Sequence, residues 1–417
     1  MIRIGNAQGF WGDWLEAPVR MVEQGPLDYL TLDYLAEVTM SILQKQRKED
    51  PALGYARDFP PLMARLAAEI AGRVKVIANA GGVNPLACAR EVKRLAPGLK
   101  VAVVLGDDLM DRLDDLGDEF SEQIAAIRPQ ILSANAYIGA FPVAEALATG
   151  ADVVIGGRIA DAALALAAMV HEFGWAEDDW DRLASGIVGG HIIECGTQAT
   201  GGNCSAAWET LPDPANIGYP ILEAEPDGTF RVTKHSGTGG VICDACIKEQ
   251  LVYEIQDPRQ YFTPDVIANF TTITLKDAHV SGVKGQPRPQ KLKVSISYHA
   301  GWRSIGTITF PGPQARRRCE IAEATVRERI AQLRLPFDAM HAEYLGDDQL
   351  MQLRFGVRGK DRKAVDRFTR EMIPLVLSGP PGGTGYGEGR PAVREIVAYA
   401  PAYLDRDQVK TRVEVVA

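Results

Sequence analysis

Short apolar runs alternate with helix-like segments over roughly the first 200 residues, and this alternation constrains the fold more than any other feature. The runs are IRIGNA near the start, LDYLTLDYL (27–35), VKVIANA (74–80), KVAVVLG (100–106), ILSANAYIGA (131–140) and DVVIGGR (152–158). Continuous apolar strands separated by helices indicate a buried, mostly parallel sheet. We therefore predict an α/β fold with a doubly wound sheet. A closed barrel of eight strand–helix units is the alternative. The sequence shows five or six such units, which suits an open sheet better.

Nearly every run ends in small or polar residues. Examples are Asn6, Asn79, Asp107, Asn135 and Arg158, each at or just after a strand end. Ligands of open α/β sheets bind at the carboxyl ends of the strands. We therefore expect these loops to converge on one crevice.

The pattern changes after a Pro- and Gly-rich stretch at 211–228, which we interpret as a domain junction. FTTITLKDA, KLKVSISYHA and RSIGTITF alternate like strands with one exposed face, and 320–333 and 363–377 resemble amphipathic helices. This predicts an α/β domain at 1–210 that carries the site loops. A smaller α+β domain at 229–417, built around a split β-α-β unit, would complete the site or form an oligomer interface.

The composition narrows the function class. A net charge of −9 and a pI near 5.4 argue against a general nucleic-acid or anionic-membrane binder. The start of the chain has no secretory pattern, and the apolar stretch at 163–170 is too short to cross a bilayer. Six cysteines in 417 residues resemble reduced cytosolic thiols. We expect a cytoplasmic protein with no membrane or nucleic-acid partner.

The turn NAGGVNP (79–85) follows a strand and precedes a helix. Asn79, Gly81, Gly82 and Asn84 would form a cradle for a phosphate or carboxylate at the helix N-terminus. The alternative is a tight turn with a helix cap. The chain has neither a G-x-G-x-x-G nor a Walker motif, so we predict no nucleotide cofactor.

GGRIAD (156–161) also follows a predicted strand and precedes a predicted helix. Arg158 would clamp a substrate carboxylate, with Asp161 as a catalytic partner, or the two would form an ion pair that fixes the loop. In GHIIECGTQATGGN (190–203), His191 and Glu194 lie three residues apart, so on a helix they would share a face and would be able to bind a metal. As a general acid/base pair they need only hydrogen-bond reach. The nearby glycines argue against a regular helix there.

Other polar residues of these loops are candidates for binding substrate. They are Asn135, Gln198 and Asn203, together with His235 at the head of a second Gly-rich track, HSGTGG (235–240). Cys243-x-x-Cys246 is a weak zinc signal, because no second pair has standard spacing. We predict no bound metal, although Asp13, Asp33 and Glu37 would be the ligands of a metal-dependent hydrolase. Asp33 and Glu37, four residues apart, would alternatively act as acid and base or begin a helix with an acidic first turn.

Two further loops carry open interpretations. Lys284, Arg288 and Lys291 lie in SGVKGQPRPQK (281–291), which is either a site for a phosphate of coenzyme A or a solvated hairpin loop. The stretch 378–391 is rich in glycine and suits a lid or a strip that packs on another subunit.

The blocks GFWGD, DYLTLDYLAE, NAGGVNP, ANAYIGA, GGRIAD, GHIIECGTQATGGN, HSGTGG and GPPGGTGYGEGRP span almost the whole chain. Together they resemble the acyclic terpene utilisation AtuA family. The resemblance implies a place in catabolism beside acyl-CoA enzymes, without fixing the reaction. Longer relatives carry a C-terminal ferredoxin-like segment, so we expect a separate small subunit of that kind, or none.

We predict a lyase or hydratase that acts by side-chain acid/base chemistry on a branched, terpenoid-type acyl or hydroxy-acid compound, free or as a coenzyme A thioester. A homo-oligomer is expected. The alternatives are a non-catalytic or partner-dependent subunit of a catabolic complex, and the metal-dependent hydrolase.

Overall fold

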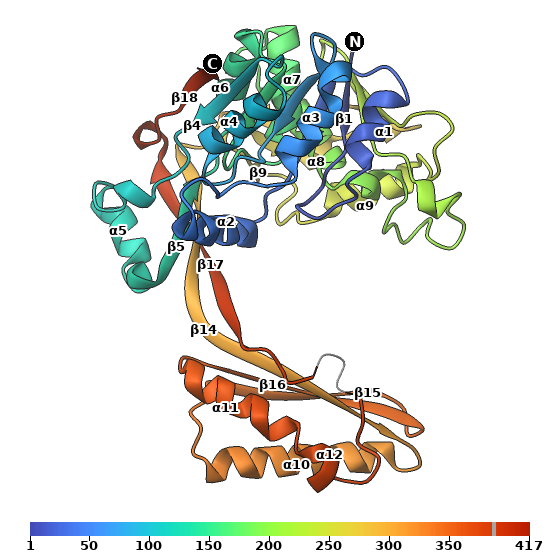
Figure 1. The fold of residues 1–417 in the computed structure, drawn as a ribbon. Helices are drawn as coiled ribbons and strands as arrows, with labels where there is room; N and C mark the ends of the chain where they lie inside the picture. The colour runs from blue at the N-terminus through green and yellow to red at the C-terminus, as the bar shows by residue number, and fades with distance from the viewer. Residues whose placement is uncertain (386–388) are drawn as a thin grey trace. The chain divides into compact units, whose positions relative to one another are not determined.

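The computed structural model describes residues 1–385 and 389–417, which form two compact units. The first unit comprises Met1–Ser297 and Tyr399–Ala417, and the second comprises Tyr298–Ala398. These bounds differ from the predicted ranges 1–210 and 229–417. The difference arises because strands from residues 221–286 and from the C-terminus join the first unit. Figure 1 shows both ends of the chain in that unit.

The first unit is built on a ten-stranded mixed sheet. From edge to edge its strands are β11 (Thr274–Lys276), β12 (His279–Ser281), β8 (Phe230–Thr233), β7 (Ile221–Ala224), β1 (Ile2–Asn6), β2 (Tyr29–Leu32), β3 (Lys75–Ala78), β6 (Val153–Gly156), β4 (Val101–Leu105) and β18 (Arg412–Val416). The five central strands are parallel to one another and are β1, β2, β3, β6 and β4. The other five strands pair antiparallel with their neighbours.

The α/β class is confirmed, but a doubly wound parallel sheet is not. The expected junction at 211–228 contains β7, which pairs with β1 from Ile2↔Ala224 to Gly5↔Ile221. The run at 131–140 also departs from the prediction: β5 (Ile131–Ala136) lies outside this sheet and pairs with β14 (Lys291–Pro311). A three-stranded sheet of β13 (Lys284–Gln286), β10 (Ile267–Asn269) and β9 (Tyr261–Phe262) completes the strands of the first unit.

Helices of the first unit form two hydrophobic layers. They are α1 (Ala17–Glu23), α2 (Glu37–Glu49), α3 (Phe59–Ile70), α4 (Pro85–Leu95), α5 (Asp118–Ile124), α6 (Phe141–Ala148), α7 (Ala163–Phe173), α8 (Trp180–Glu194) and α9 (Asp244–Val252). Short 3₁₀ segments lie at η1 (Met110–Arg112), η2 (Arg128–Gln130), η3 (Gly196–Thr200), η4 (Pro214–Asn216), η5 (Phe270–Thr272) and η6 (Arg406–Gln408). Among the residues described, no helix combines the length and apolarity that crossing a membrane requires.

Both faces of the parallel strands are buried, which explains their continuous apolar runs. In β4, Val101 and Val103 join a cluster with residues of α3 and α4, while Ala102 and Val104 join a cluster with residues of α6, α7 and α8. Successive side chains of a strand point to opposite faces, so each face has its own hydrophobic core.

The second unit has the order β-α-β-β-α-β, as expected for a split β-α-β arrangement. Its sheet order is β15 (Ala339–Gly346), β16 (Leu350–Gly359), β14 and β17 (Arg394–Asp405). The helices are α10 (Ala315–Gln332), α11 (Arg362–Met372) and the short α12 (Leu375–Ser378). Phe310, Phe355 and Phe368 lie in its core.

Candidate functional site

A cavity of about 960 Å³ lies within the first unit and gathers charged side chains from distant parts of the chain. Its lining includes the carboxylates Asp13, Asp33, Asp161, Glu194 and Glu254, the cations Arg158, Lys291 and Lys293, and the aromatic residues Phe10, Tyr137, Tyr253, Tyr261, Phe262 and Tyr403. The loops after β1, β5 and β6 line it, in agreement with the predicted convergence. The predicted loops after β3 and β4 do not.

Helix α8 carries the predicted acid/base pair. It continues through Gly189 and Gly190 to Glu194, so the expectation that glycines interrupt it is wrong. The glycines serve close packing: a Cβ on Gly190 would lie 2.2 Å from the Ala162 carbonyl oxygen. At the end of the helix, Asn6 Nδ2 donates to the carbonyl oxygens of Ile193 (2.8 Å) and Glu194 (3.1 Å). β1 therefore fixes the position of Glu194.

His191 and Glu194 meet as their spacing predicts, with Nδ1 and Oε1 2.9 Å apart. Glu194 lines the cavity, whereas His191 is 1% exposed and packs with its ring 5.5 Å from the ring centroids of Tyr261 and Phe270. The imidazole thus lies behind Glu194 and does not line the cavity. The prediction that both side chains face the substrate needs correction, and Glu194 is the group in contact with the cavity.

The environment shifts the pKa values of both partners. Burial raises the pKa of Glu194, and the neighbouring His191 charge offsets only part of this effect. Burial lowers the pKa of His191, but the Glu194 carboxylate outweighs it, so the net shift is upward. The pair therefore retains a proton to higher pH than the separate groups would. Such a shift is typical of carboxylates used in proton transfer.

Asp33 is a second buried carboxylate at the cavity, positioned by the end of β2. Its Oδ1 accepts hydrogen bonds from Asn79 Nδ2 at 2.6 Å and from the Leu35 N–H at 3.1 Å. Burial raises its pKa well above the ordinary value, and the nearby Asp161 adds to the rise, while Arg158 opposes it. The sequence indicated Asp33, together with Glu37, as an acid/base pair, as a metal ligand or as an acidic helix start. The feature of the sequence that could have identified Asp33 as a cavity residue was its position at the end of a predicted strand.

Arg158 and Asp161 form the ion pair that was one of the two predicted alternatives. Arg158 Nη1 lies 2.5 Å from Asp161 Oδ1, and the Arg158 side chain is 2% exposed. The guanidinium carbon lies 4.2 Å from the centroid of the Tyr137 ring, within the range of a cation–π contact. Both partners line the cavity, so the pair also presents charge to a bound molecule.

The NAGGVNP turn does not line the cavity. Asn79 is fully buried, donates to Asp33 and accepts the Tyr34 N–H at 2.7 Å. A Cβ on Gly81 would lie 2.6 Å from the Gly156 carbonyl oxygen, and Gly82 has a φ of +52° with Leu43 against it. Asn84 Nδ2 donates to the carbonyl oxygens of Leu53 (2.8 Å) and Pro51 (3.0 Å). The structure places a packed turn here, since these groups already have protein partners.

Of the remaining predicted binding residues, only Gln198 lines the cavity. Asn135 is buried and donates to Asp107 Oδ2 at 2.9 Å. Asn203 is exposed and donates to Gln198 Oε1 at 2.9 Å. His235 is buried elsewhere, with its Nε2 2.8 Å from the Met21 carbonyl oxygen. The two Gly-rich tracks therefore do not form opposite walls of one pocket.

The expectation of fully reduced cysteines is wrong, because Cys204 and Cys246 form a disulfide. The other cysteines are free thiols. Within the described part of the chain, no group of three or more His, Cys, Asp and Glu side chains is placed to hold a metal ion. Asp13 binds the Tyr219 hydroxyl through Oδ1 at 2.7 Å, and the Glu37 side chain lies outside the described residues.

The basic loop at 281–291 is largely paired with acidic residues. Lys284 contacts Asp181 at 2.7 Å, and Arg288 contacts Glu177 at 2.7 Å. Lys291 lines the cavity and also contacts Glu119. The suggested lid at 378–391 includes 386–388, which are outside the described residues.

Comparison with known proteins identifies the family. No curated protein matches the sequence. Among solved structures, the de novo designed protein Ferredog-Diesel aligns with 23% of this chain and 88% of its own, at 17% identity and a TM-score of 0.17, which carries no argument about fold or function. The family model described as "Acyclic terpene utilisation family protein AtuA" matches residues 2–415. The chain therefore belongs to the acyclic terpene utilisation AtuA family.

Proposed function

We propose that the chain is an enzyme of acyclic terpene catabolism that adds or removes water, or cleaves a carbon–carbon bond, on a branched acyl or hydroxy-acid compound. The substrate would be free or a coenzyme A thioester. The observation that carries this proposal is the cavity lined by the carboxylates Glu194, Asp33 and Asp161 and by the cation of Arg158, which pairs with Asp161. Its volume of about 960 Å³ fits the upper range of small-molecule sites.

The cationic side of the cavity suits the acyl oxygen or carboxylate of such a substrate. Arg158 and Lys293 both lie over the Tyr137 ring, at 4.2 Å and 4.8 Å from its centroid. A fixed positive charge stabilises the oxygen on which negative charge develops when a proton leaves the neighbouring carbon. Leu35, Ile187, Leu292 and the aromatic residues of the lining would contact the branched hydrocarbon.

Glu194 and Asp33 would divide the proton transfers between them. Glu194, held by His191 at 2.9 Å, would take the proton from the carbon next to the acyl group. Asp33 is buried, and its raised pKa favours the protonated form that can donate to a departing hydroxyl. In this proposal His191 is a positioning residue, because it acts through Glu194.

Substitution of the two carboxylates tests the proposal. Purified protein is assayed with branched unsaturated and hydroxy acids and with their coenzyme A thioesters, and products are identified by mass spectrometry. Glu194→Gln and Asp33→Asn should each lower kcat by about 10²- to 10⁴-fold, the range for loss of a general acid or base. Glu145→Gln, on an exposed part of α6, is the matched control and should retain activity.

Retention of turnover by both Glu194→Gln and Asp33→Asn would refute the acid/base roles. Binding of the substrates without turnover, with activity restored by a second protein, would favour the partner-dependent subunit instead. A cytoplasmic location, a homo-oligomer and a separate ferredoxin-like subunit stay predictions, to be tested by fractionation of the native host and by light scattering.

A further inference from the structure

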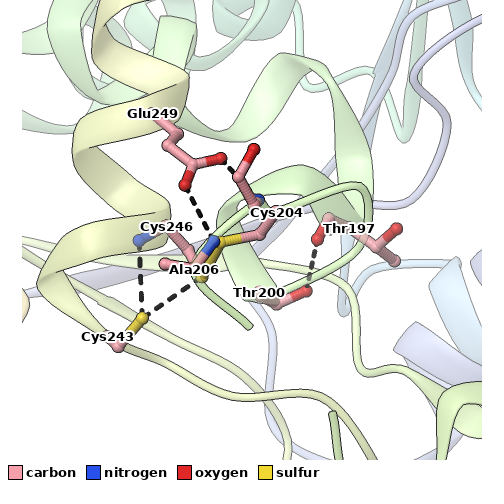
Figure 2. The surroundings of a disulfide bond; sticks show 8 residues. Thr197, Thr200, Cys204, Ala206, Cys243, Cys246 and Glu249 are labelled. Atoms are coloured by element: carbon pink, nitrogen blue, oxygen red, sulfur yellow. Dashed lines mark hydrogen bonds between the residues drawn. A yellow bond between two sulfur atoms is a disulfide. The ribbon is translucent and has the colours of Figure 1, made fainter. Parts of the chain in front are cut away.

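Three cysteine sulfurs lie together at the start of α9, outside the cavity lining (Figure 2). Cys246, in the first turn of α9, is bonded to Cys204, which follows η3. Cys243 is a free thiol at the N-cap of the helix, and its Sγ lies 3.2 Å from the Cys246 Sγ. We propose that these residues form a thiol–disulfide exchange site in which Cys246 changes its partner between Cys204 and Cys243.

The surroundings assign the attacking role to Cys243. The disulfide is enclosed in a small apolar cluster, with Cys204 2% exposed and Cys246 0% exposed, whereas Cys243 is only half-buried. The Cys246 backbone N–H donates to the Cys243 Sγ at 3.4 Å. Cys243 therefore places a free thiol beside the bond, and the thiolate of such a group is the form that attacks a disulfide.

The exchange balances without an added oxidant or reductant. The Cys243 thiol loses its proton to water, and its thiolate forms a bond to the Cys246 sulfur. The bond between Cys246 and Cys204 breaks, and Cys204 leaves with the electron pair and takes up a proton. One disulfide and one thiol are present before and after the step, so the oxidation state of the protein is unchanged.

The fold can accommodate both linkages because the Cys204 segment has a second attachment to α9. Glu249 accepts the backbone N–H groups of Ser205 at 2.8 Å and Ala206 at 3.0 Å. Figure 2 shows the Glu249 carboxylate directed toward Ala206. A further bond joins Gln198 Nε2 to Gln250 Oε1 at 3.1 Å. Release of Cys204 therefore frees one sulfur without detaching the segment.

Disulfide mapping of the full-length protein tests the exchange. The protein is purified without reductant and equilibrated in a glutathione redox buffer. The sample is then quenched with acid, alkylated and digested without reduction for mass spectrometry. We expect both linkages in the wild type, with Cys204 alkylated in the molecules that carry Cys243–Cys246. Cys243→Ser should abolish Cys204 alkylation under the same buffer, and Cys204→Ser should yield only Cys243–Cys246.

Other outcomes overturn the proposal. If Cys243 is always alkylated and Cys204 never is, the disulfide is fixed. If Cys204 is alkylated equally in the wild type and in Cys243→Ser, the buffer reduces the disulfide directly. If all three residues are thiols and the protein retains one zinc ion per chain by atomic absorption, the cluster is a metal site.

Discussion

Replacing each of the three clustered cysteines by serine should change the free energy of unfolding by a different amount. Cys204 and Cys246 are 42 residues apart, and closing a loop of that size contributes about 4 kcal/mol by the chain-entropy relation. A link between Cys243 and Cys246 closes a far smaller loop, for which the same relation gives about 2 kcal/mol. In oxidised protein, Cys246→Ser should therefore cost about 4 kcal/mol, and Cys204→Ser only about 2 kcal/mol because Cys243 replaces the lost partner.

Urea unfolding followed by tryptophan fluorescence measures these differences. All of the tryptophans except Trp302 lie in the first unit, so the signal reports mainly on the unit that holds the disulfide. Cys243→Ser leaves the existing disulfide intact and should be near the wild type. With excess dithiothreitol, all variants should converge. Equal losses for Cys204→Ser and Cys246→Ser would show that Cys243 does not take over, and the absence of any loss would refute the disulfide's contribution.

Three further predictions concern the buried groups. His191→Phe removes a charge that lowers the pKa of Glu194, so the acidic limb of the kcat/KM profile should move to higher pH; an unchanged limb would contradict the proposed pairing. Gly190→Ala should lower the free energy of unfolding, measured by chemical denaturation, by about 1–3 kcal/mol, because the added Cβ would clash with the Ala162 carbonyl oxygen. Gly98→Ala is the control and should be close to neutral, because a Cβ at Gly98 has no atom within 4 Å. Burial raises the pKa of Asp265 from 3.8 to about 6. The free energy of unfolding of the wild type should therefore fall as pH rises through this range, because the buried carboxyl must ionise, whereas asparagine does not. Over the same range the free energy of unfolding of Asp265→Asn should rise by up to about 3 kcal/mol relative to the wild type, and parallel stability–pH curves would refute the shift.

Several features could be read from the sequence because they depend on short segments. Continuous apolar runs identified strands buried on both faces, since every side chain of such a strand meets a hydrophobic layer. The spacing of three between His191 and Glu194 predicts contact on a helix, and the side chains do meet, although the glycines beside them argued against the helix that brings them together. The same spacing at Arg158 and Asp161 allowed the ion pair that the structure contains.

Other features depended on packing between segments that the sequence keeps far apart. The antiparallel strand β7 lies in a stretch whose prolines and glycines indicate a junction, and only its pairing with β1 makes it part of the sheet. Asn79 reaches Asp33 because β2 and β3 are neighbours, so a residue expected to bind substrate instead holds a carboxylate at the cavity.

The sequence by itself thus determined the α/β class, the parallel strands and the local charge pairs, because 3.6- and 2-residue periodicities and short spacings are properties of one segment. Only the tertiary structure decided that Glu194 lines the cavity while His191 lies behind it, and that Cys204 meets Cys246. The physical reason is that desolvation and long-range contact depend on which surfaces pack together, and a hydrophobic surface has no directional preference for one partner over another.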